Sequence, residues 1–282
     1  MRMNWKPYLR LLRVPNWRGY FLMASFGFLI AKGFLFSFKD IIIFYAIILL
    51  FLAFGFSVND CFDTKEDEYK KDSVNPIVKK EIIFKKALFL SILLGILGLT
   101  LSAVFGLKVL LFSLAGVLLS FFYSAPPLRT KSRPLIDLIS HGLFAGAFLF
   151  FLPLLIFNSE LTLFHYLITF SIFYFSITLE LRNHLEDYET DKKAGLRTFV
   201  CVVGFEGSEK LLRYLAIFYP LTLFPIFLLI PQGYLFFFFF LTLVFLFFLL
   251  FRKTLKIVKN YKVMDVYAIL SFSSLSLATI LF

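Results

Sequence analysis

Long apolar segments recur along the whole chain and decide its fold class. A helix needs about 20 mostly apolar residues to cross the hydrocarbon core of a bilayer, and nine segments approach or reach that length. They are residues 19–38, 41–57, 87–106, 109–123, 136–157, 163–180, 211–230, 234–251 and 266–282. The sequence therefore predicts an all-α membrane protein with nine transmembrane helices in one bundle, forming a single domain over residues 1–282.

The composition excludes the main soluble classes. Hydrophobic residues make up 60% of the chain and charged residues 17%, whereas soluble domains average about 45–50% apolar and about 25% charged residues. The two cysteines, Cys61 and Cys201, lie in no CxxC or Cys/His cluster. A disulfide-rich scaffold, a zinc site and a haem attachment site are therefore excluded.

Basic residues indicate how the segments are oriented. With the N-terminus in the cytoplasm, 26 of the 29 Lys and Arg residues fall on the cytoplasmic side, and only Lys32, Lys39 and Lys108 fall outside. Because cytoplasmic loops are enriched in Lys and Arg, we expect a multi-pass protein of the cell membrane, with its C-terminus outside. The net charge of +11 then belongs to loop ends and does not indicate nucleic-acid binding. Residues 1–18 mix aromatic and basic side chains, which predicts an interfacial segment.

Acidic residues concentrate in two matched segments, each following an even-numbered apolar segment. Both segments read Asn-x3-Asp-x3-Asp, and the six residues are Asn59, Asp63, Asp67, Asn183, Asp187 and Asp191. Spacing of i, i+4 and i+8 places three side chains on one face of a helix. Four segments separate the two motifs, so both face the same side of the membrane. A solvated loop whose acids balance nearby lysines is the alternative interpretation.

Matched carboxylates at a membrane margin suit a metal-held phosphate. Mg²⁺ prefers oxygen ligands and is often held by one or two carboxylates together with substrate phosphates. Carboxylates alone would repel a phosphate, so cations are expected nearby. Arg129 and Lys131 follow the fourth segment on the same side, after the stiff Pro126-Pro127 pair. They are either phosphate ligands or positive residues that anchor the end of that segment.

The motifs resemble those of the UbiA-type intramembrane prenyltransferases. The segment NDCFDTKED is similar to that family's NDxxDxxxD motif, and EDYETDKKAG is similar to its second aspartate motif, DxxxD followed by a glycine. The segment YSAPPLRTK resembles the YSxPPxRxK loop of several branches, and LRVPN resembles the N-terminal signature. Nine segments and the positions of the loops agree as well, so the resemblance covers essentially the whole chain.

The resemblance implies a bundle around a central cavity and Mg²⁺-dependent transfer of a prenyl group from a prenyl diphosphate to an aromatic or lipid acceptor in the membrane. An aromatic-lined pocket would stabilise the allylic cation. The expected catalytic residues are Asp63, Asp187, Arg129 and Lys131. The expected metal ligands are Asn59, Asp60, Asp63, Asp67, Asp187 and Asp191, and the expected substrate-binding residues are Asn16, Tyr123, Ser124, Arg129, Lys131, Asn183 and His184.

The second motif departs from the family in two ways. It is preceded by Arg182-Asn183-His184, where many members carry an acidic or small residue. His184 is either an acceptor-side base or a structural histidine. The motif also differs from the DxEGD pattern of the glycerol-lipid branch, which argues against a geranylgeranylglyceryl phosphate acceptor.

Two other functional classes fit a polytopic chain with acidic residues. Ion or solute transporters place polar groups near the membrane centre in broken helices, whereas the acids here lie at one end of the segments. A lipid-headgroup alcohol phosphotransferase also uses paired aspartates, but its DGxxAR-type motif is absent from this sequence. Within the resembled family, a cyclase and a haem-modifying enzyme stay open.

Overall fold

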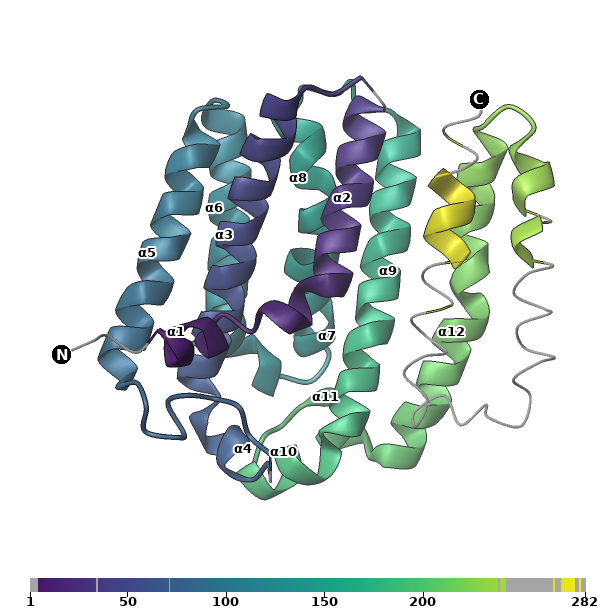
Figure 1. Ribbon diagram of the computed structural model, residues 1–282. Coiled ribbons are helices and arrows are strands. Elements are labelled where there is room, and N and C mark those ends of the chain that lie inside the picture. Colours follow the sequence, from purple (N-terminus) through teal and green to yellow (C-terminus); the bar gives the residue numbers. More distant parts are fainter. Residues whose placement is uncertain are drawn as a thin grey trace.

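A computed structural model describes residues 5–33, 35–70, 72–237, 239–241, 266, 270–276 and 279. These residues form helices joined by loops, without a β-strand among them. The elements are α1 (Lys6–Leu11), η1 (Val14–Trp17), α2 (Arg18–Lys32), α3 (Phe38–Phe62), α4 (Thr64–Glu68), α5 (Phe84–Ala103), α6 (Leu107–Ser124), η2 (Thr130–Ser132), α7 (Ile136–His141), η3 (Gly142–Ala147), α8 (Phe148–Ile156), α9 (Leu163–Glu186), α10 (Tyr188–Ala194), α11 (Phe199–Val203) and α12 (Phe205–Leu228). The long helices run roughly parallel (Figure 1).

Six segments of the described part are long and apolar enough to cross a membrane. They are α3, α5, α6, the continuous stretch Ile136–Ile156 made of α7, η3 and α8, and then α9 and α12. The first predicted segment, residues 19–38, is represented by the shorter helix α2. The last two, residues 234–251 and 266–282, lie largely outside the described residues. An all-helical membrane fold is confirmed, and the count of nine stays a prediction.

The first predicted segment is divided in the structure. Helix α2 ends at Lys32 because Gly33 adopts a left-handed backbone with φ of 57°, which glycine tolerates without steric cost. Helix α3 then begins with a capping box, in which Ser37 and Asp40 satisfy each other's backbone N–H groups. The structure therefore divides this apolar run, because α2 ends within it, a turn follows, and α3 begins.

The two aspartate motifs share the same local structure. Helices α3 and α9 run past the predicted ends, Ser57 and Glu180, and stop at the residue before the central aspartate of each motif. Short helices α4 and α10 begin immediately after Asp63 and Asp187. The three positions of each motif thus span two helices that meet at the central aspartate, and do not lie on one face of a continuous helix. Both short helices lie at the same end of the bundle (Figure 1).

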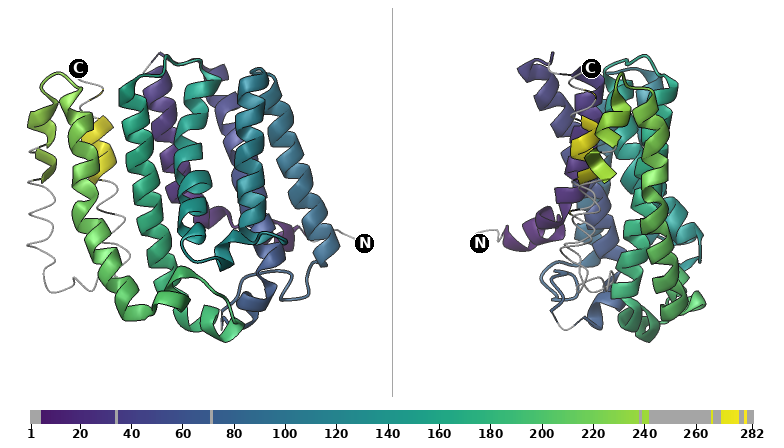
Figure 2. Two further views of the ribbon diagram at one scale, coloured as in Figure 1. Left: turned by 180° about the vertical axis from the view of Figure 1, so that it is seen from behind. Right: turned by 90° about the vertical axis from the view of Figure 1, so that its right-hand side faces the viewer.

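The packing of the long helices leaves room for a cavity between them. Helix α2 packs on α8, α3 on α5, and α9 on both α12 and the π-helical turn η3. The two larger apolar cores lie around Phe150, Phe175 and Tyr219 and around Phe44 and Leu152. The side view in Figure 2 shows α1 projecting sideways from the bundle. That orientation suits the predicted interfacial segment, which stays a prediction.

Candidate active site

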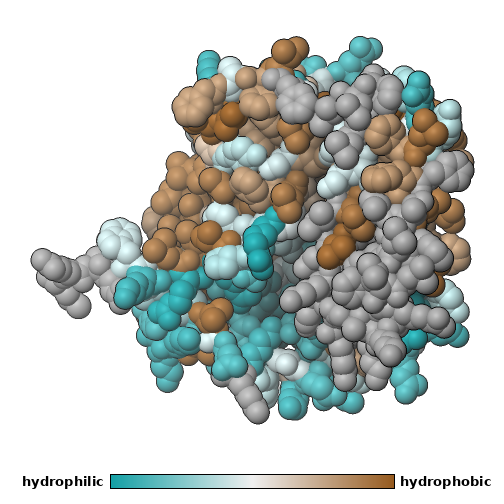
Figure 3. Space-filling view, turned by 45° about the vertical axis from the view of Figure 1, so that its right-hand side comes forward, coloured by the Kyte–Doolittle hydropathy of each residue, from teal (hydrophilic) through white to brown (hydrophobic). Residues whose placement is uncertain are grey.

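A cavity of ≈ 400 Å³ lies between α2, α3, α6, α8 and α9. Its polar part is formed by α4, α10 and the loops at the end of the bundle that carries both motifs. Its apolar part extends between the long helices. Figure 3 shows hydrophilic side chains gathered over the lower part of one face and apolar ones dominating the upper part. The molecule thus joins a polar opening to an apolar interior.

Eleven of the thirteen residues predicted for the site line this cavity. They are Asn16, Asn59, Asp63, Asp67, Tyr123, Ser124, Lys131, Asn183, His184, Asp187 and Asp191. Asp60 and Arg129 are the two predicted residues that do not line it. Residues from four separate parts of the sequence therefore meet in one place, as the resemblance implies.

Two lysines hold the carboxylates of the polar part. The Lys70 ammonium group lies 3.0 Å from Asp187 Oδ2 and 3.9 Å from Asp67 Oδ1, so it connects the two motifs. Lys131 pairs with Asp63 and lies 3.5 Å from Glu66 Oε1. Burial of Lys70 lowers the pKa of its ammonium group, but the charge of Asp187 and the hydrogen bond to it outweigh this and raise the pKa above its ordinary value.

Asp60 does not line the cavity. Its side chain is buried and pairs with Arg13, which also donates to Asp67 Oδ2 over 3.1 Å. A carboxylate held in this way positions the end of α3 against the N-terminal segment. The expectation that Asp60 is a metal ligand therefore does not fit this arrangement, because consecutive residues of a helix point about 100° apart and Asn59 takes the position that faces the cavity.

Arg129 also lies outside the cavity. Its guanidinium pairs with Glu66 and donates to the carbonyl oxygen of Phe62 over 3.2 Å. These contacts tie the loop before η2 to the junction of α3 and α4. Arg129 is thus placed as a positioning residue for Glu66, whereas Lys131, two residues later, reaches the cavity itself.

The chemistry of the polar part fits a hard divalent cation. Asn59 uses its amide nitrogen to donate to Ser124 over 3.2 Å, which leaves its carbonyl oxygen for another partner. Glu66 is buried, and its Oε2 atom has no hydrogen-bond partner in the described part of the chain. Burial and the charge of Asp187 raise the pKa of Asp191 to about 7, so a cation beside it would favour its ionised form.

The carboxylates are held apart by the lysines. Within the described residues, no three His, Cys, Asp or Glu side chains stand close enough to hold a metal ion as they are placed. Lys70 and Lys131 occupy the positions between the acids. Binding of a metal therefore requires these two ammonium groups to change partner, and a substrate phosphate at the same place is a suitable new partner.

Aromatic rings surround the cavity between its polar and apolar parts. Tyr20 meets Phe56 edge-on at 5.5 Å between ring centroids, and Tyr123 lies 5.1 Å from Phe144. All four line the cavity. Ring faces attract positive charge, so this region can stabilise a carbocation.

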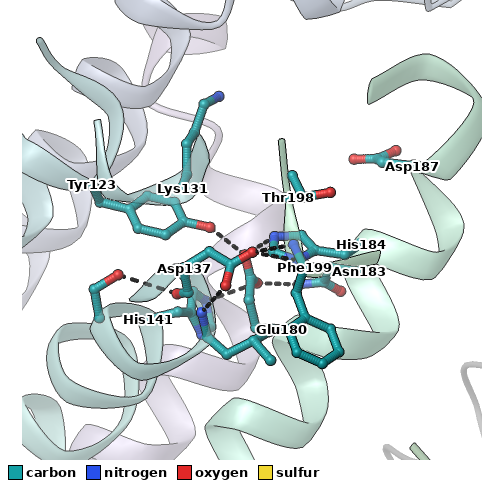
Figure 4. A network of polar contacts seen from close by, with 12 residues as sticks. Tyr123, Lys131, Asp137, His141, Glu180, Asn183, His184, Asp187, Thr198 and Phe199 are labelled. Carbon is teal, nitrogen blue, oxygen red and sulfur yellow. Dashed lines mark hydrogen bonds and ion pairs between the residues drawn. The ribbon is translucent and has the colours of Figure 1, made fainter. Parts of the chain in front are cut away.

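A buried polar cluster lies beneath these rings, centred on Glu180. Its carboxylate accepts hydrogen bonds from Tyr123 and, over 3.0 Å, from Asn183. His184 Nε2 lies 3.1 Å from Glu180 Oε1, and His141 Nε2 lies 3.3 Å from Oε2. In Figure 4 the Tyr123 hydroxyl points at Glu180, while Asp187 lies apart from the cluster.

Close helix contact brings the cluster together. A Cβ atom on Gly146 would lie 2.6 Å from Ser176 Cβ, so glycine is required where η3 meets α9. That contact places His141 Nδ1 3.2 Å from the Ser176 hydroxyl and its Nε2 beside Glu180. A π-helical turn at this point fits the general association of such turns with functional sites.

Sequence reasoning missed several cavity residues, chiefly Arg13, Glu66, Lys70, His141 and Glu180. Glu180 carried a usable signal, because an acidic residue within an apolar segment is costly and is functional by default. Hydropathy instead places Glu180 at the end of the sixth predicted segment. Glu66 lies within the first acidic motif, between Asp63 and Asp67.

Comparisons with known proteins agree with this geometry. Residues 20–275 match the UbiA prenyltransferase family. The digeranylgeranylglyceryl phosphate synthase of Saccharolobus solfataricus is 27% identical over 219 residues, covering 76% of this chain and 75% of that protein. The protein of the same name from Sulfurisphaera tokodaii is 25% identical over 206 residues, covering 73% of each. A UbiA homolog from Archaeoglobus fulgidus, solved bound to GPP and Mg²⁺, superposes with a TM-score of 0.78, at 24% identity, over 98% of this chain and 100% of that one.

The family match spans most of the chain, from α2 to beyond α12, and includes both aspartate motifs and the polar loop after α6. A prenyltransferase is the class that these motifs resemble, and the shared fold places them around one cavity. The chain belongs to the UbiA prenyltransferase family.

Proposed function

We propose that this protein transfers a prenyl group from a prenyl diphosphate to the hydroxyl group of a lipid, in a reaction that depends on Mg²⁺. The observation that carries the proposal is the single cavity in which both aspartate motifs and two lysines adjoin an aromatic, apolar interior. Family membership makes the chain a prenyltransferase, and the transporter and phosphotransferase alternatives are set aside on that ground.

The polar part would hold the diphosphate of the donor. Asp63, Asp67, Asp187 and Asp191, with the carbonyl oxygen of Asn59 and the free oxygen of Glu66, are the residues that would hold Mg²⁺. When bound, Mg²⁺ would neutralise negative charge on the leaving diphosphate. Lys70 and Lys131 would exchange their carboxylate partners for diphosphate oxygens and stabilise the charge that develops as the carbon–oxygen bond breaks.

The rings beside the polar part would receive the prenyl chain and the cation. Tyr20, Phe56, Tyr123 and Phe144 present π faces near the point where the diphosphate would leave. Phe51 and Phe148, which line the apolar part, would exclude water from the cation. Exclusion of water matters because hydrolysis of the cation competes with transfer to the acceptor.

A lipid hydroxyl is the acceptor that the relatives support best. Both compared relatives are named digeranylgeranylglyceryl phosphate synthase, which points to a glyceryl phosphate lipid. An aromatic acceptor is the second candidate, since the second motif differs from the DxEGD pattern at Thr190. That difference is confined to one position, because Asp187, Glu189 and Asp191 occupy the three acidic positions of the pattern.

We also place the polar opening of the cavity on the cytoplasmic side of the cell membrane. Both motifs and the loop that carries Lys131 lie at one end of the bundle (Figure 1). The basic loops after the second, fourth and sixth predicted segments, which the structure describes, lie at that end. The placement rests on the distribution of 26 of the 29 basic residues.

The test is incubation of purified protein with geranylgeranyl diphosphate, Mg²⁺ and single acceptors. The panel contains geranylgeranylglyceryl phosphate, hydroxybenzoate, a naphthoate and homogentisate, and products are identified by mass spectrometry. We expect diphosphate release coupled to alkylation of the glyceryl phosphate. Alkylation of an aromatic compound alone would move the assignment to the second candidate, and cyclisation of the donor without an acceptor would indicate a cyclase.

The positions of Lys131 and Arg129 predict unequal effects of their removal. Lys131→Ala should lower kcat/KM for the prenyl diphosphate by about 100-fold, corresponding to about 3 kcal/mol of lost electrostatic stabilisation. Arg129→Ala removes contacts with Glu66 and with the Phe62 carbonyl and should cost about tenfold. Steady-state kinetics with varied donor concentration measure both values.

The matched pair also tests the placement of Arg129 outside the cavity. Arg129→Lys keeps a charge near Glu66 but lacks the planar fork, so it should recover part of the loss. A larger effect at Arg129 than at Lys131, in folded protein, would instead mean that Arg129 contacts the diphosphate.

A further inference from the structure

Glu180 is a carboxylate set apart from the acids of the two aspartate motifs. It precedes Asp187 by seven residues on α9, which is about 10 Å along a helix and toward the interior of the span. It is 5% exposed, and it lines the cavity together with Tyr123, His141 and His184. A buried, ionisable group in a membrane span is costly unless it is partnered and in use. Binding of the diphosphate therefore does not explain why a carboxylate is buried at this position.

Four side chains that line the cavity contact Glu180, and Tyr123 is the one that donates a hydroxyl proton to it. Oε1 receives the Tyr123 hydroxyl and faces His184, while Oε2 faces Asn183 and His141. A carboxylate has about four lone-pair positions, so these groups saturate it. The phenolic oxygen of Tyr123, in contrast, donates its one proton to Glu180 and still has lone pairs with which to accept another. Tyr123 can thus carry a proton from an acceptor in the cavity to Glu180.

We infer that Tyr123 and Glu180 form a relay that removes the proton from the hydroxyl group of the acceptor. The inference rests on the proposed function and adds to it the group that completes the reaction. Prenyl transfer to a hydroxyl releases one proton for each bond formed. The aspartates of the polar part are committed to the metal, and Glu180 is the carboxylate beside the aromatic rings.

During transfer, the bond between the first prenyl carbon and the diphosphate oxygen breaks, and the electron pair leaves with the diphosphate. A lone pair of the acceptor oxygen forms the new carbon–oxygen bond. The proton of that oxygen moves to Tyr123 Oη as the proton of Tyr123 moves to Glu180 Oε1. The products are a prenyl ether, diphosphate and a protonated Glu180.

The remaining members of the cluster hold the relay in place and connect it onward. His184 lies between two carboxylates, because its Nδ1 atom is 3.5 Å from Asp137 Oδ2. Asp137 is itself fixed by the backbone N–H groups of Leu138 and, over 2.6 Å, Phe199. His141 connects Glu180 with Tyr20, whose hydroxyl lies 3.4 Å from His141 Nε2. These imidazoles give the proton a path away from the reacting carbon.

The experiment compares two acceptors that differ only in the reacting atom. Geranylgeranylglyceryl phosphate presents an alcohol, and its analogue with a thiol in place of the reacting hydroxyl presents a group that ionises near pH 8.5. A thiolate attacks without a base. Glu180→Gln should slow transfer to the alcohol by about 100-fold and transfer to the thiol by less than tenfold. Tyr123→Phe should show the same ratio.

The matched control is Glu209→Gln on α12, which lies outside the cavity and pairs with Arg213. It should leave both transfer rates within about twofold of the parent protein. Equal losses with the alcohol and the thiol in Glu180→Gln would overturn the relay and assign Glu180 to packing or to stabilisation of the cation. Alkylation of neither probe by the parent protein, with diphosphate still released, would overturn the hydroxyl acceptor. Absence of any diphosphate release would reject the proposed function itself.

Discussion

Replacing Asp63 or Asp187 with alanine is expected to lower the rate of donor cleavage by about 10³-fold. Each residue is the central aspartate of its motif, placed where a long helix ends and a short one begins. Both line the cavity, and each is held by a lysine. Loss of one carboxylate would remove a proposed metal ligand and leave Lys131 or Lys70 without its partner. A 10³-fold change corresponds to about 4 kcal/mol, the upper part of the range for one electrostatic group in an active site.

The measurement is diphosphate release from geranylgeranyl diphosphate at saturating Mg²⁺, for protein that elutes as a single folded species in detergent. Asp72→Ala is the matched control, since Asp72 is an exposed acid of the same loop and does not line the cavity. It should retain the parent rate within about twofold. Rates near those of the parent protein in both Asp63→Ala and Asp187→Ala would return the two motifs to the solvated-loop interpretation.

The position of the site could be predicted because the membrane restricts the fold so strongly. A spanning segment must satisfy its backbone within a helix, so counting segments decides which loops share a side. Two Asn-x3-Asp-x3-Asp motifs separated by four segments therefore had to meet at one end. The structure confirms that meeting for Asn59, Asp63, Asn183 and Asp187.

Which side of a helix each side chain takes, and whether it reaches the cavity, could not be predicted in the same way. Asp60 is adjacent to Asn59 and belongs to the same motif, yet it pairs with Arg13 and does not line the cavity, because rotation of α3 is decided by its packing on α5 and on the N-terminal segment. Arg129 and Lys131 differ by two positions and separate for a similar reason. Whether a side chain lines the cavity depends on tertiary contacts, and these cannot be inferred from the spacing of residues along a helix.

The helix ends show a further limit of hydropathy. Polar residues such as Asn59 and Glu180 lower the mean hydropathy of a window, so the predicted segments ended at Ser57 and Glu180. The helices continue to Phe62 and Glu186 because their backbone hydrogen bonds continue regardless of polarity. The functional groups lie on the extra turns of α3 and α9, where the apolar pattern has already ended.

Removal of divalent cations is expected to lower donor cleavage by at least 10³-fold. Besides Glu180, six acidic residues of the described part line the cavity: Asp63, Glu66, Asp67, Glu186, Asp187 and Asp191. Two like charges 4 Å apart repel by about 4 kcal/mol at an effective dielectric constant near 20. A single such uncompensated contact with the diphosphate already accounts for about 10³-fold in affinity or rate.

The lysines cannot replace the metal, because each is already committed to a carboxylate. Lys131 neutralises Asp63, and Lys70 neutralises Asp187, so transfer of either ammonium group to the diphosphate exposes an acid. A divalent cation removes this conflict by contributing two charges among oxygen ligands. Mg²⁺ should restore full activity after chelation, and Ca²⁺, which prefers longer bonds and more ligands, should restore less.

Diphosphate binding gives a readout of this dependence that needs no turnover. A non-cleavable prenyl thiodiphosphate should raise the thermal unfolding midpoint in the presence of Mg²⁺ and much less in its absence, because a ligand stabilises only the state that binds it. Lys70→Met removes the contact between the two motifs and one cation of the polar part. This substitution should therefore weaken binding of the analogue at saturating Mg²⁺, while binding should still depend on Mg²⁺. Equal stabilisation by the analogue with and without Mg²⁺ would show that the protein's own cations are sufficient for the diphosphate, and the acids would then need another role.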